Sequence, residues 1–424
     1  MKRSSLSDWL QYQQSLNREE IDLSLDRVKK LFEKLNLEFP DKNTFLIAGT
    51  NGKGTTLALI EDLIIIRGLK TGAYTSPHLI EYNERITVNK ANVADQDLID
   101  SFEHIESLRG DIPLTYFEFG TLAAFNLLSN FNCDALLIEV GLGGRLDATN
   151  IIDPNVSIIT NIDLDHQDWL GETINEIAFE KAGITKANKP LVYGDIKALS
   201  VIKEQAKLKK SKLLSRDKDF SIVKKNHCLS WWGVDHSIEM IKVPDHWADG
   251  ELNNLATALT AIESSDPALL PSTDELNNVL ENFSVPGRFE LIENRSKWIL
   301  DVAHNPGAAK NFKHRLKSIN LDKDNTMIIS MMRDKNLEEF IDIFRDIVSL
   351  WVVCKMDTDR SFLSNELKEK LGAIGIKNII VMDTPYEAFK YVENLRPISD
   401  NIIVSGSFEL VGPAKEYLSK VREI

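Results

Sequence analysis

The chain has 424 residues, which is too many for one ordinary hydrophobic core, so we expect two domains. Its 50 basic and 64 acidic residues give a net charge of −14, which argues against nucleic acid as a partner because that affinity needs a basic surface. No apolar run reaches the roughly 18–20 residues that span a bilayer, and the start MKRSSLSDWLQYQQ lacks the apolar core of a secretory signal. The three cysteines have no metal-binding spacing, and we expect a cytoplasmic protein that does not act at a membrane.

Short apolar runs alternate with segments of helical period, which predicts an α/β fold with a largely parallel sheet. The predicted strands of the first part are 44–48, 71–74, 135–140, 156–160 and 190–193. The predicted helices are 25–37, 55–67, 96–108, 119–130, 174–182 and 252–262. The stretch 213–242 alternates as a small antiparallel sheet would, and 266–273 is typical of a loop.

The alternation then restarts in the last third of the chain. Its predicted strands are 298–302, 327–331, 350–353, 378–382 and 401–405. Its predicted helices are 306–319, 337–347, 365–371, 385–394 and 408–418. The sequence SVPG breaks the helical pattern that precedes it. We therefore expect a larger domain over residues 1–286 and a smaller α/β domain over residues 287–424.

A glycine-rich loop, AGTNGKGTT, joins the first predicted strand to the next predicted helix. Glycines let the backbone approach oxygen anions, and a helix N-terminus offers N–H donors. Lys53 can reach the β- and γ-phosphates of a nucleotide, and a following threonine can bind magnesium. We therefore predict an ATP phosphate site at Thr50, Asn51, Gly52, Lys53, Gly54, Thr55 and Thr56. The loop is shorter than a standard P-loop, and by itself it also suits a nucleotide-driven switch or transport ATPase.

Glu139 ends the apolar run LLIE, where a carboxylate is costly unless it is paired or bound to metal. The carboxyl end of a strand is the usual ligand side of an α/β sheet. Three other polar residues carry weaker signals. Taken alone, Ser76 suits a turn or helix cap, His166 a surface loop and Lys181 a solvated helix face.

Together these motifs resemble the bifunctional dihydrofolate synthase/folylpolyglutamate synthase family of the Mur ligase superfamily, in which the short GTNGKG loop is the usual form. The other matching blocks are TSPHLIEYNERITVN, LTYFEFGTLAAF, LLIEVGLGGRLDATN, DHQDWLGETINEIAFEKAGI, VPGRFE, DVAHNPGAA and SGSF. The resemblance implies a P-loop Mur-ligase-like larger domain with a parallel sheet. It also implies a smaller Rossmann-like C-terminal domain that binds glutamate and closes over ATP.

The activity that the resemblance implies is that of an ATP-dependent acid–amino-acid ligase in folate biosynthesis and one-carbon metabolism. L-Glutamate is added to dihydropteroate, giving dihydrofolate, and to reduced folates, giving folylpolyglutamates. The acceptor carboxylate attacks the γ-phosphate to give an acyl phosphate and ADP. The glutamate amine then attacks the acyl carbon and phosphate leaves.

The resemblance also implies roles for individual residues. The catalytic set is Lys53, Glu139, His166 and Lys181, and two Mg²⁺ ions are held by Ser76, Glu139, His166 and a carbamate on Lys181. Further ATP contacts come from Asn254, Arg288 and Asp301, and His304 positions glutamate. The pterin acid binds Thr115, Tyr116, Phe117, Glu118, Leu146, Asp147, Ala148 and a stretch matching Ser15–Arg18. We expect Phe119 and Phe125 to be core residues instead.

Several alternatives stay open at this stage. The chain could be a folylpolyglutamate synthase without the dihydropteroate activity, or a P-loop switch or transport ATPase that makes no bond. A Mur-type cell-wall ligase would need a separate N-terminal domain, for which a loop beginning at residue 48 leaves no room. A K⁺ requirement is also open. Because no heptad pattern or long apolar stripe is evident, we expect a monomer.

Overall fold

The computed structural model describes residues 3–17, 24–39, 41, 43–225, 228–293, 296–395 and 401–422. The chain divides into two compact units. The first contains Met1–Asp163, Gln167–Lys242 and Glu251–Glu281, and the second contains Leu164–His166, Val243–Gly250 and Asn282–Ile424. The second unit thus includes two short segments from the middle of the chain. Within the described ranges, no helix combines the length and apolarity needed to cross a bilayer.

An eight-stranded sheet is the framework of the first unit, in the order β4-β3-β2-β5-β1-β6-β7-β8. Its strands are β1 (Thr44–Ala48), β2 (Thr71–Tyr74), β3 (Ile86–Val88), β4 (Ala91–Asn92), β5 (Ala135–Glu139), β6 (Val156–Ile159), β7 (Leu191–Tyr193) and β8 (Leu213–Ser215). Neighbours from β2 to β8 pair in parallel, and β3 and β4 are antiparallel. Every residue of β1, β2, β5 and β6 is buried, as expected of a parallel sheet that is covered on both faces.

Helices pack against this sheet and complete the core of the first unit. They are α1 (Leu6–Leu16), α2 (Asp26–Leu35), α3 (Lys53–Ile65), α4 (Asp95–Arg109), α5 (Tyr116–Asn130), α6 (Gln167–Leu170), α7 (Ile174–Ala182) and α8 (Leu199–Leu208), with the 3₁₀ turns η1 (Tyr82–Arg85) and η2 (Ala148–Ile151). Phe119 and Phe125 are fully buried in this core, which confirms their expected role.

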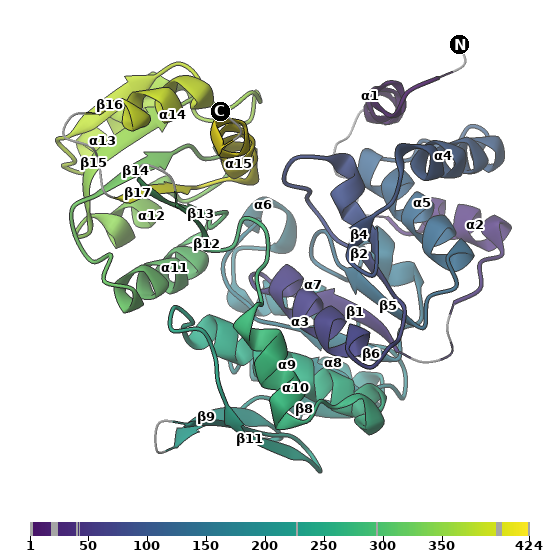
Figure 1. Ribbon diagram of the computed structural model, residues 1–424. Coiled ribbons are helices and arrows are strands. Elements are labelled where there is room, and N and C mark those ends of the chain that lie inside the picture. The colour runs from purple at the N-terminus through teal and green to yellow at the C-terminus, as the bar shows by residue number, and fades with distance from the viewer. Residues whose placement is uncertain are drawn as a thin grey trace. The chain divides into compact units, whose positions relative to one another are not determined.

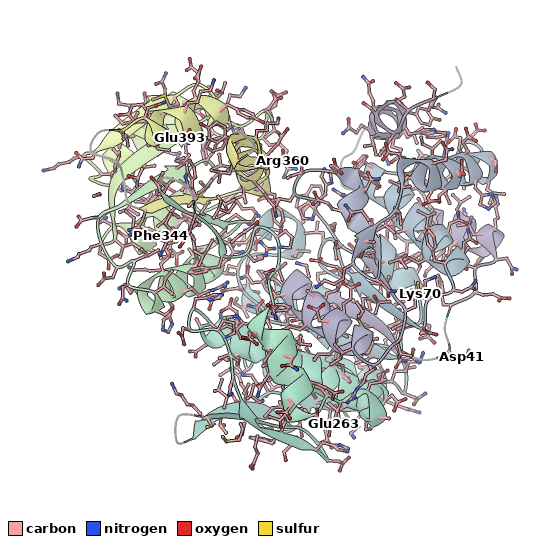
Figure 2. All side chains as sticks on the ribbon, in the orientation of Figure 1. Asp41, Lys70, Glu263, Phe344, Arg360 and Glu393 are labelled. Atoms are coloured by element: carbon pink, nitrogen blue, oxygen red, sulfur yellow. The ribbon has the colours of Figure 1, made fainter. Side chains whose placement is uncertain are left out.

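A separate antiparallel sheet is formed by β9 (Ser221–Lys225), β10 (Cys228–Trp232) and β11 (Ser237–Ile241). It lies beside α9 (Asp249–Ser265) and α10 (Thr273–Glu281), which the 3₁₀ turn η3 (Pro267–Leu269) separates along the chain (Figure 1). Glu263, labelled in Figure 2, accepts hydrogen bonds at 2.9 Å from the backbone N–H groups of Val234, Asp235 and His236. The prediction of an antiparallel excursion over 213–242 is right for these three strands. It is wrong for β8, which extends the large sheet in parallel by pairing with β7.

The second unit is built on a six-stranded sheet in the order β12-β13-β17-β14-β15-β16. Its strands are β12 (Glu290–Glu293), β13 (Lys297–Asp301), β14 (Asn325–Ile329), β15 (Val348–Cys354), β16 (Ile379–Met382) and β17 (Asn401–Ser405). Only β12 pairs antiparallel. The helices are α11 (Pro306–Ser318), α12 (Leu337–Phe344), α13 (Ser364–Ala373), α14 (Pro385–Glu393) and α15 (Phe408–Arg422) (Figure 1).

Helix α5 differs from the prediction in a way that affects the candidate site. It begins at Tyr116 rather than at residue 119, because Thr115 caps it. The Thr115 side chain accepts from Glu118 N–H, and the Glu118 side chain accepts from Thr115 N–H, which is a capping box. Of the residues predicted to bind the pterin acid, Thr115 is therefore the N-cap of a helix, and Tyr116, Phe117 and Glu118 form its first turn.

Candidate active site

The glycine-rich loop follows β1 and is held by the residues that follow β6. Thr50 N–H donates to the Asn161 carbonyl at 3.0 Å, and Asn51 N–H donates to Asn161 Oδ1 at 2.7 Å. The Thr160 hydroxyl donates to the Asn51 carbonyl at 2.6 Å. Because β1 and β6 are adjacent and parallel, these contacts fix the loop at the carboxyl edge of the sheet.

Two glycines of the loop cannot be replaced without displacing a neighbour. A Cβ on Gly49 would lie 1.8 Å from Thr160 Oγ1. Gly52 has a φ of 82°, and a Cβ there would lie 2.4 Å from Asn254 Oδ1. The Asn254 side chain, predicted to contact ATP, therefore packs directly against the phosphate loop.

Three of the predicted catalytic residues meet at this loop. Lys53 Nζ donates to the Gly49 carbonyl at 3.2 Å, and Lys181 Nζ, from α7, donates to the same oxygen at 3.1 Å. Glu139 Oε1 lies 3.9 Å from Lys53 Nζ. Lys181 is buried, so it is not the solvated helix lysine that its sequence context alone would suggest. Two cations and one carboxylate thus converge on one loop.

The oxygen groups around Glu139 are of the kind that Mg²⁺ prefers. A Cβ on Gly54 would lie 3.7 Å from Glu139 Oε2, so this carboxylate reaches the first turn of α3. In that turn Thr56 is buried, and its hydroxyl has no hydrogen-bond partner among the described residues. Ser76 follows β2, and β2 pairs in parallel with β5, so Ser76 and Glu139 lie at the same edge of the sheet.

The described residues contain no group of three or more His, Cys, Asp or Glu that could hold a metal by themselves. An ion beside Glu139 would therefore need hydroxyl, carbamate, phosphate or water oxygens as well. The donors present fit magnesium, which usually keeps water and phosphate ligands.

His166 is placed differently from the other predicted metal ligands. It lies in Leu164–His166, a segment of the second unit, whereas Ser76, Glu139 and Lys181 belong to the first. Its φ is 52°, in the left-handed region that is uncommon for a residue with a Cβ. That the four side chains share metal ions stays a prediction.

Asp165, the neighbour of His166, is a buried carboxylate with several partners. Lys335 Nζ donates to Oδ1 at 2.6 Å, and Asn305 Nδ2 donates to Oδ2 at 2.9 Å. His304 Nε2 lies 3.5 Å from Oδ2. Burial acts to raise the pKa of Asp165, but the contact with His304 and the charges of His304, Lys335 and His166 hold it well below its usual value. Asp165 is therefore an anion in this unit.

Glu118, at the predicted acceptor site, is paired with a residue that the sequence did not single out. Arg27 Nη2 of α2 donates to Glu118 Oε1 at 2.8 Å. Glu118 also caps α5, as described above. Burial raises its pKa, and the hydrogen bond from Arg27 opposes that shift. Tyr116 and Phe117, in the same turn, are half-buried.

The two predicted acceptor-binding blocks lie side by side in the first unit. A Cβ on Gly141 would lie 2.4 Å from the Phe117 ring, so this ring packs on the loop that leads to Leu146, Asp147 and Ala148. Asp147 accepts from Leu142 N–H at 2.8 Å and from Thr149 N–H at 2.9 Å, and it caps η2. Burial raises the pKa of Asp147, opposed by these hydrogen bonds. Leu146 is half-buried and Ala148 is buried.

Arg85 is a second cation that sequence reasoning missed, although it stands in the quoted block TSPHLIEYNERITVN. It is buried, and its Nε donates to His78 Nδ1 at 2.8 Å. Its guanidinium carbon lies 5.2 Å from the centre of the Tyr82 ring and 5.7 Å from that of Tyr116. Of the N-terminal stretch Ser15–Arg18 that was predicted to contact the acceptor, Arg18 lies outside the described residues.

In the second unit, Asp301 ends β13 and holds two loops. It accepts from Phe289 N–H and from Ala303 N–H, each at 2.8 Å. Burial raises its pKa, and the charges of Arg315 and Arg288 oppose the shift. Arg288 and His304 both lie beside Phe408, which follows β17 in the SGSF block. The structure therefore brings together three blocks of this unit that the sequence had singled out separately.

Two family models match the chain: the Mur ligase middle domain over residues 47–239, and the Mur ligase glutamate ligase domain over residues 287–408. The chain is 35% identical over 419 residues to the dihydrofolate synthase/folylpolyglutamate synthase of Escherichia coli strain K12, covering 99% of this chain and 97% of the relative. It belongs to that family. The family and the fold class predicted from the sequence are confirmed.

Solved structures of similar proteins agree with this assignment. One is described as E. coli FolC in complex with DHPP and ADP, with 35% identity, a TM-score of 0.91 and 99% of each chain covered. Another is a bifunctional folylpolyglutamate synthase/dihydrofolate synthase with Mn, AMPPNP and L-glutamate bound, with 34% identity, a TM-score of 0.88 and 98% of each chain covered. The individual site residues of the present chain stay predictions.

Proposed function

We propose that this protein is an ATP-dependent ligase that joins L-glutamate to dihydropteroate and to reduced folates through an acyl phosphate. Its full-length similarity to the dihydrofolate synthase/folylpolyglutamate synthase of E. coli supports this activity. The observation that carries the chemistry is the convergence of Lys53 and Lys181 on the Gly49 carbonyl, beside Glu139. That arrangement puts positive charge where a nucleotide phosphate and an acyl phosphate would develop negative charge.

In this proposal the phosphate loop, Thr50–Thr56, binds the triphosphate with the backbone N–H groups at the start of α3 and with Lys53. Asn254 supports the loop at Gly52 and reaches the nucleotide from α9. Arg288 and Asp301 complete the nucleotide contacts, and His304 positions the incoming glutamate. Residues 287–424 form the glutamate-binding domain, and residues 1–286 bind ATP and the acceptor.

The metal site in the proposal uses Ser76, Glu139, His166 and a carbamate on Lys181 to hold two Mg²⁺. When bound, Mg²⁺ neutralises phosphate charge during transfer. Two ammonium groups on one carbonyl oxygen repel each other, and converting Lys181 to a carbamate would replace that repulsion with an anionic ligand. The Lys181 ammonium first loses one proton. Attack of the neutral amine on carbon dioxide then forms the N–C bond, opens one C=O π bond and releases a second proton.

The acceptor in the proposal lies against Phe117 and the Leu146–Ala148 loop, with Tyr116 and Glu118 beside it. Flat heteroaromatic rings need such stacking faces and a few directed polar groups. The proposed enzyme is a cytoplasmic monomer. It uses two magnesium ions, and a K⁺ requirement is a further part of the proposal.

The test is incubation of the purified protein with ATP, Mg²⁺ and radiolabelled glutamate, with dihydropteroate or tetrahydrofolate as acceptor. We expect labelled product with both. Product with tetrahydrofolate alone would reduce the function to that of a folylpolyglutamate synthase. ATP hydrolysis without product from either acceptor would overturn the proposal and favour a nucleotide-driven switch or transport ATPase.

A further inference from the structure

Lys335 and Asp165 form a buried ion pair to which the proposed function assigns no role. Their side chains are 8% and 7% exposed, and Lys335 Nζ lies 2.6 Å from Asp165 Oδ1. Desolvation makes a buried ion pair a weak source of stability, while removing one partner leaves an uncompensated charge. A buried pair can fix a particular geometry even where it adds little to stability.

The pair lies between two histidines of the candidate site. Asp165 Oδ2 is 3.5 Å from His304 Nε2, and Lys335 Nζ is 3.5 Å from His166 Nε2. Each charge therefore faces one imidazole ring. The other nitrogen of His304, Nδ1, lies 2.8 Å from the Val302 carbonyl, so this ring is held from both sides.

The backbone at His166 is held by the same carboxylate. His166 N–H donates to Asp165 Oδ1 at 2.9 Å, at a residue with a φ of 52°. Together with Lys335, this N–H occupies Oδ1, while Asn305 and His304 face Oδ2. The acceptor positions of the Asp165 carboxylate are thus taken within the second unit, and they hold both the backbone of His166 and the ring of His304.

We propose that Lys335 and Asp165 act as positioning residues, a clamp that fixes the His166 and His304 rings for metal and glutamate binding. The inference rests on the proposed function for the roles of the two histidines. Neither Lys335 nor Asp165 needs to touch a substrate. Lys335 would act through the Asp165 carboxylate, and Asn305 would hold that carboxylate from the other side.

The first test is Lys335→Met, which removes the charge and keeps the length of the side chain. We expect the KM for glutamate and the half-saturating Mg²⁺ concentration each to rise roughly 10- to 100-fold, as for other small misplacements of site groups. Lys370→Met is the matched control, since Lys370 pairs with Glu338 at 2.8 Å in the same unit but is 41% exposed. The control should leave both constants unchanged.

The double variant Lys335→Met/Asp165→Asn distinguishes a positioning role from a role in stabilising the fold. It also tests the proposal if Lys335→Met alone does not fold. Neither member of the buried pair is charged in this variant, and Asp334, which lies 3.5 Å from Lys335 Nζ, is partly exposed, so the unfolding midpoint should return toward that of the wild type. The clamp predicts that the KM and the Mg²⁺ requirement stay raised. Recovery of stability and of both constants together would overturn the proposal.

Histidine ring NMR gives a readout that does not depend on turnover. The chain has eight histidines, and His→Gln variants would assign the signals of His166 and His304. Both signals should shift in Lys335→Met and stay in place in Lys370→Met; unshifted signals would overturn the clamp. If the wild type forms no glutamylated product, the proposed function fails, and these signals alone then decide whether Lys335 positions the two rings.

Discussion

Glu139 and Asp301 occupy corresponding places in the two sheets but have different surroundings. Each is the buried last residue of a strand, β5 in one unit and β13 in the other, although β13 also pairs antiparallel with β12. Glu139 faces Lys53 at 3.9 Å, which is longer than a direct hydrogen bond. Asp301 instead accepts two backbone N–H groups at 2.8 Å. The same sequence pattern therefore gives one carboxylate that faces a phosphate loop and another that holds backbone.

A carboxylate at a strand end therefore marks the ligand side of a sheet, but its position alone does not determine what the carboxylate does there. Asp301 ties the turn at Phe289 to the loop at Ala303, so it shapes the second unit even before ligands bind. We expect changes at Lys53 and Glu139 to act on the reaction, and changes at Asp301 to act on folding as well.

The largest effect is expected for Lys53→Ala. The variant lacks the ammonium group that the loop presents to the phosphates. We therefore expect glutamate incorporation to fall by roughly 1000-fold or more with both acceptors, which is the upper end of the effect of removing one donor that stabilises a transition state. The effect on unfolding should be much smaller than the effect on turnover, because Lys53 bonds two loop carbonyls and lies 3.9 Å from the Glu139 carboxylate at a partly exposed position. Lys90→Ala is the control, since Lys90 forms an exposed pair with Asp62. Near-normal turnover with either acceptor would remove this loop from the mechanism.

Asp301→Ala and Glu139→Ala test the comparison directly. Alanine at 301 leaves two buried N–H groups without an acceptor, which should lower the free energy of unfolding by about 2–4 kcal/mol. Alanine at 139 should lower the free energy of unfolding by less than alanine at 301, while raising the Mg²⁺ concentration needed for activity. Chemical denaturation and Mg²⁺ titration of both variants measure these effects. If Glu139→Ala proves the less stable variant, the contrast between the two carboxylates is wrong.

Much of the fold could be predicted because its signals are local. Strands such as Thr44–Ala48 and Asn401–Ser405 have the predicted bounds, since apolar runs between glycine-rich or polar turns mark strand ends well. The parallel pairing of β8 with β7 could not be predicted, because a short strand does not show which neighbour it will choose. The early start of α5 did have a signal, the capping-box spacing of Thr115 and Glu118, which was overlooked.

The residues of the candidate site likewise fall into those that the sequence could predict and those that it could not. Motif and strand-end position were enough to nominate Lys53 and Glu139, and the structure brings them to one edge of the sheet. The contact between Lys335 and Asp165 joins residues 170 positions apart, and the sequence around either one reads as an ordinary charged loop. Arg27 was missed for a related reason, because its partner Glu118 lies 91 residues away.

Glu118→Gln asks whether a carboxylate that holds backbone can also recognise a ligand. Glutamine keeps an acceptor for the cap but loses the charge that pairs with Arg27. We expect the KM for dihydropteroate to rise about tenfold more than that for tetrahydrofolate, a difference of about 1.4 kcal/mol. Asp147→Asn should act in the same direction. Glu176→Gln, in the corresponding capping box of α7, is the control. Equal losses with both acceptors would refute a distinct pterin site.

Glu263 is a carboxylate that holds a turn, through three backbone N–H groups and the His236 ring at 2.9 Å, and its substitution should give the smallest effect on the reaction. Its two oxygens accept three consecutive N–H groups of the turn between β10 and β11. In Glu263→Gln one oxygen becomes an NH₂ group, so at least one N–H loses its acceptor, and the free energy of unfolding should fall by about 1–3 kcal/mol. Glu281→Gln, at an exposed position, is the control.

Chemical denaturation and kcat/KM with both acceptors would be measured on the same preparations of Glu263→Gln. We expect lower stability and unchanged kcat/KM, because the three-stranded sheet contains none of the predicted site residues. A fall in kcat/KM for one acceptor at conditions where the variant is fully folded would contradict this and make the β10–β11 turn part of the reaction. The contrast between Glu139 and Asp301 would then be one of degree, since backbone-holding carboxylates would also tune binding.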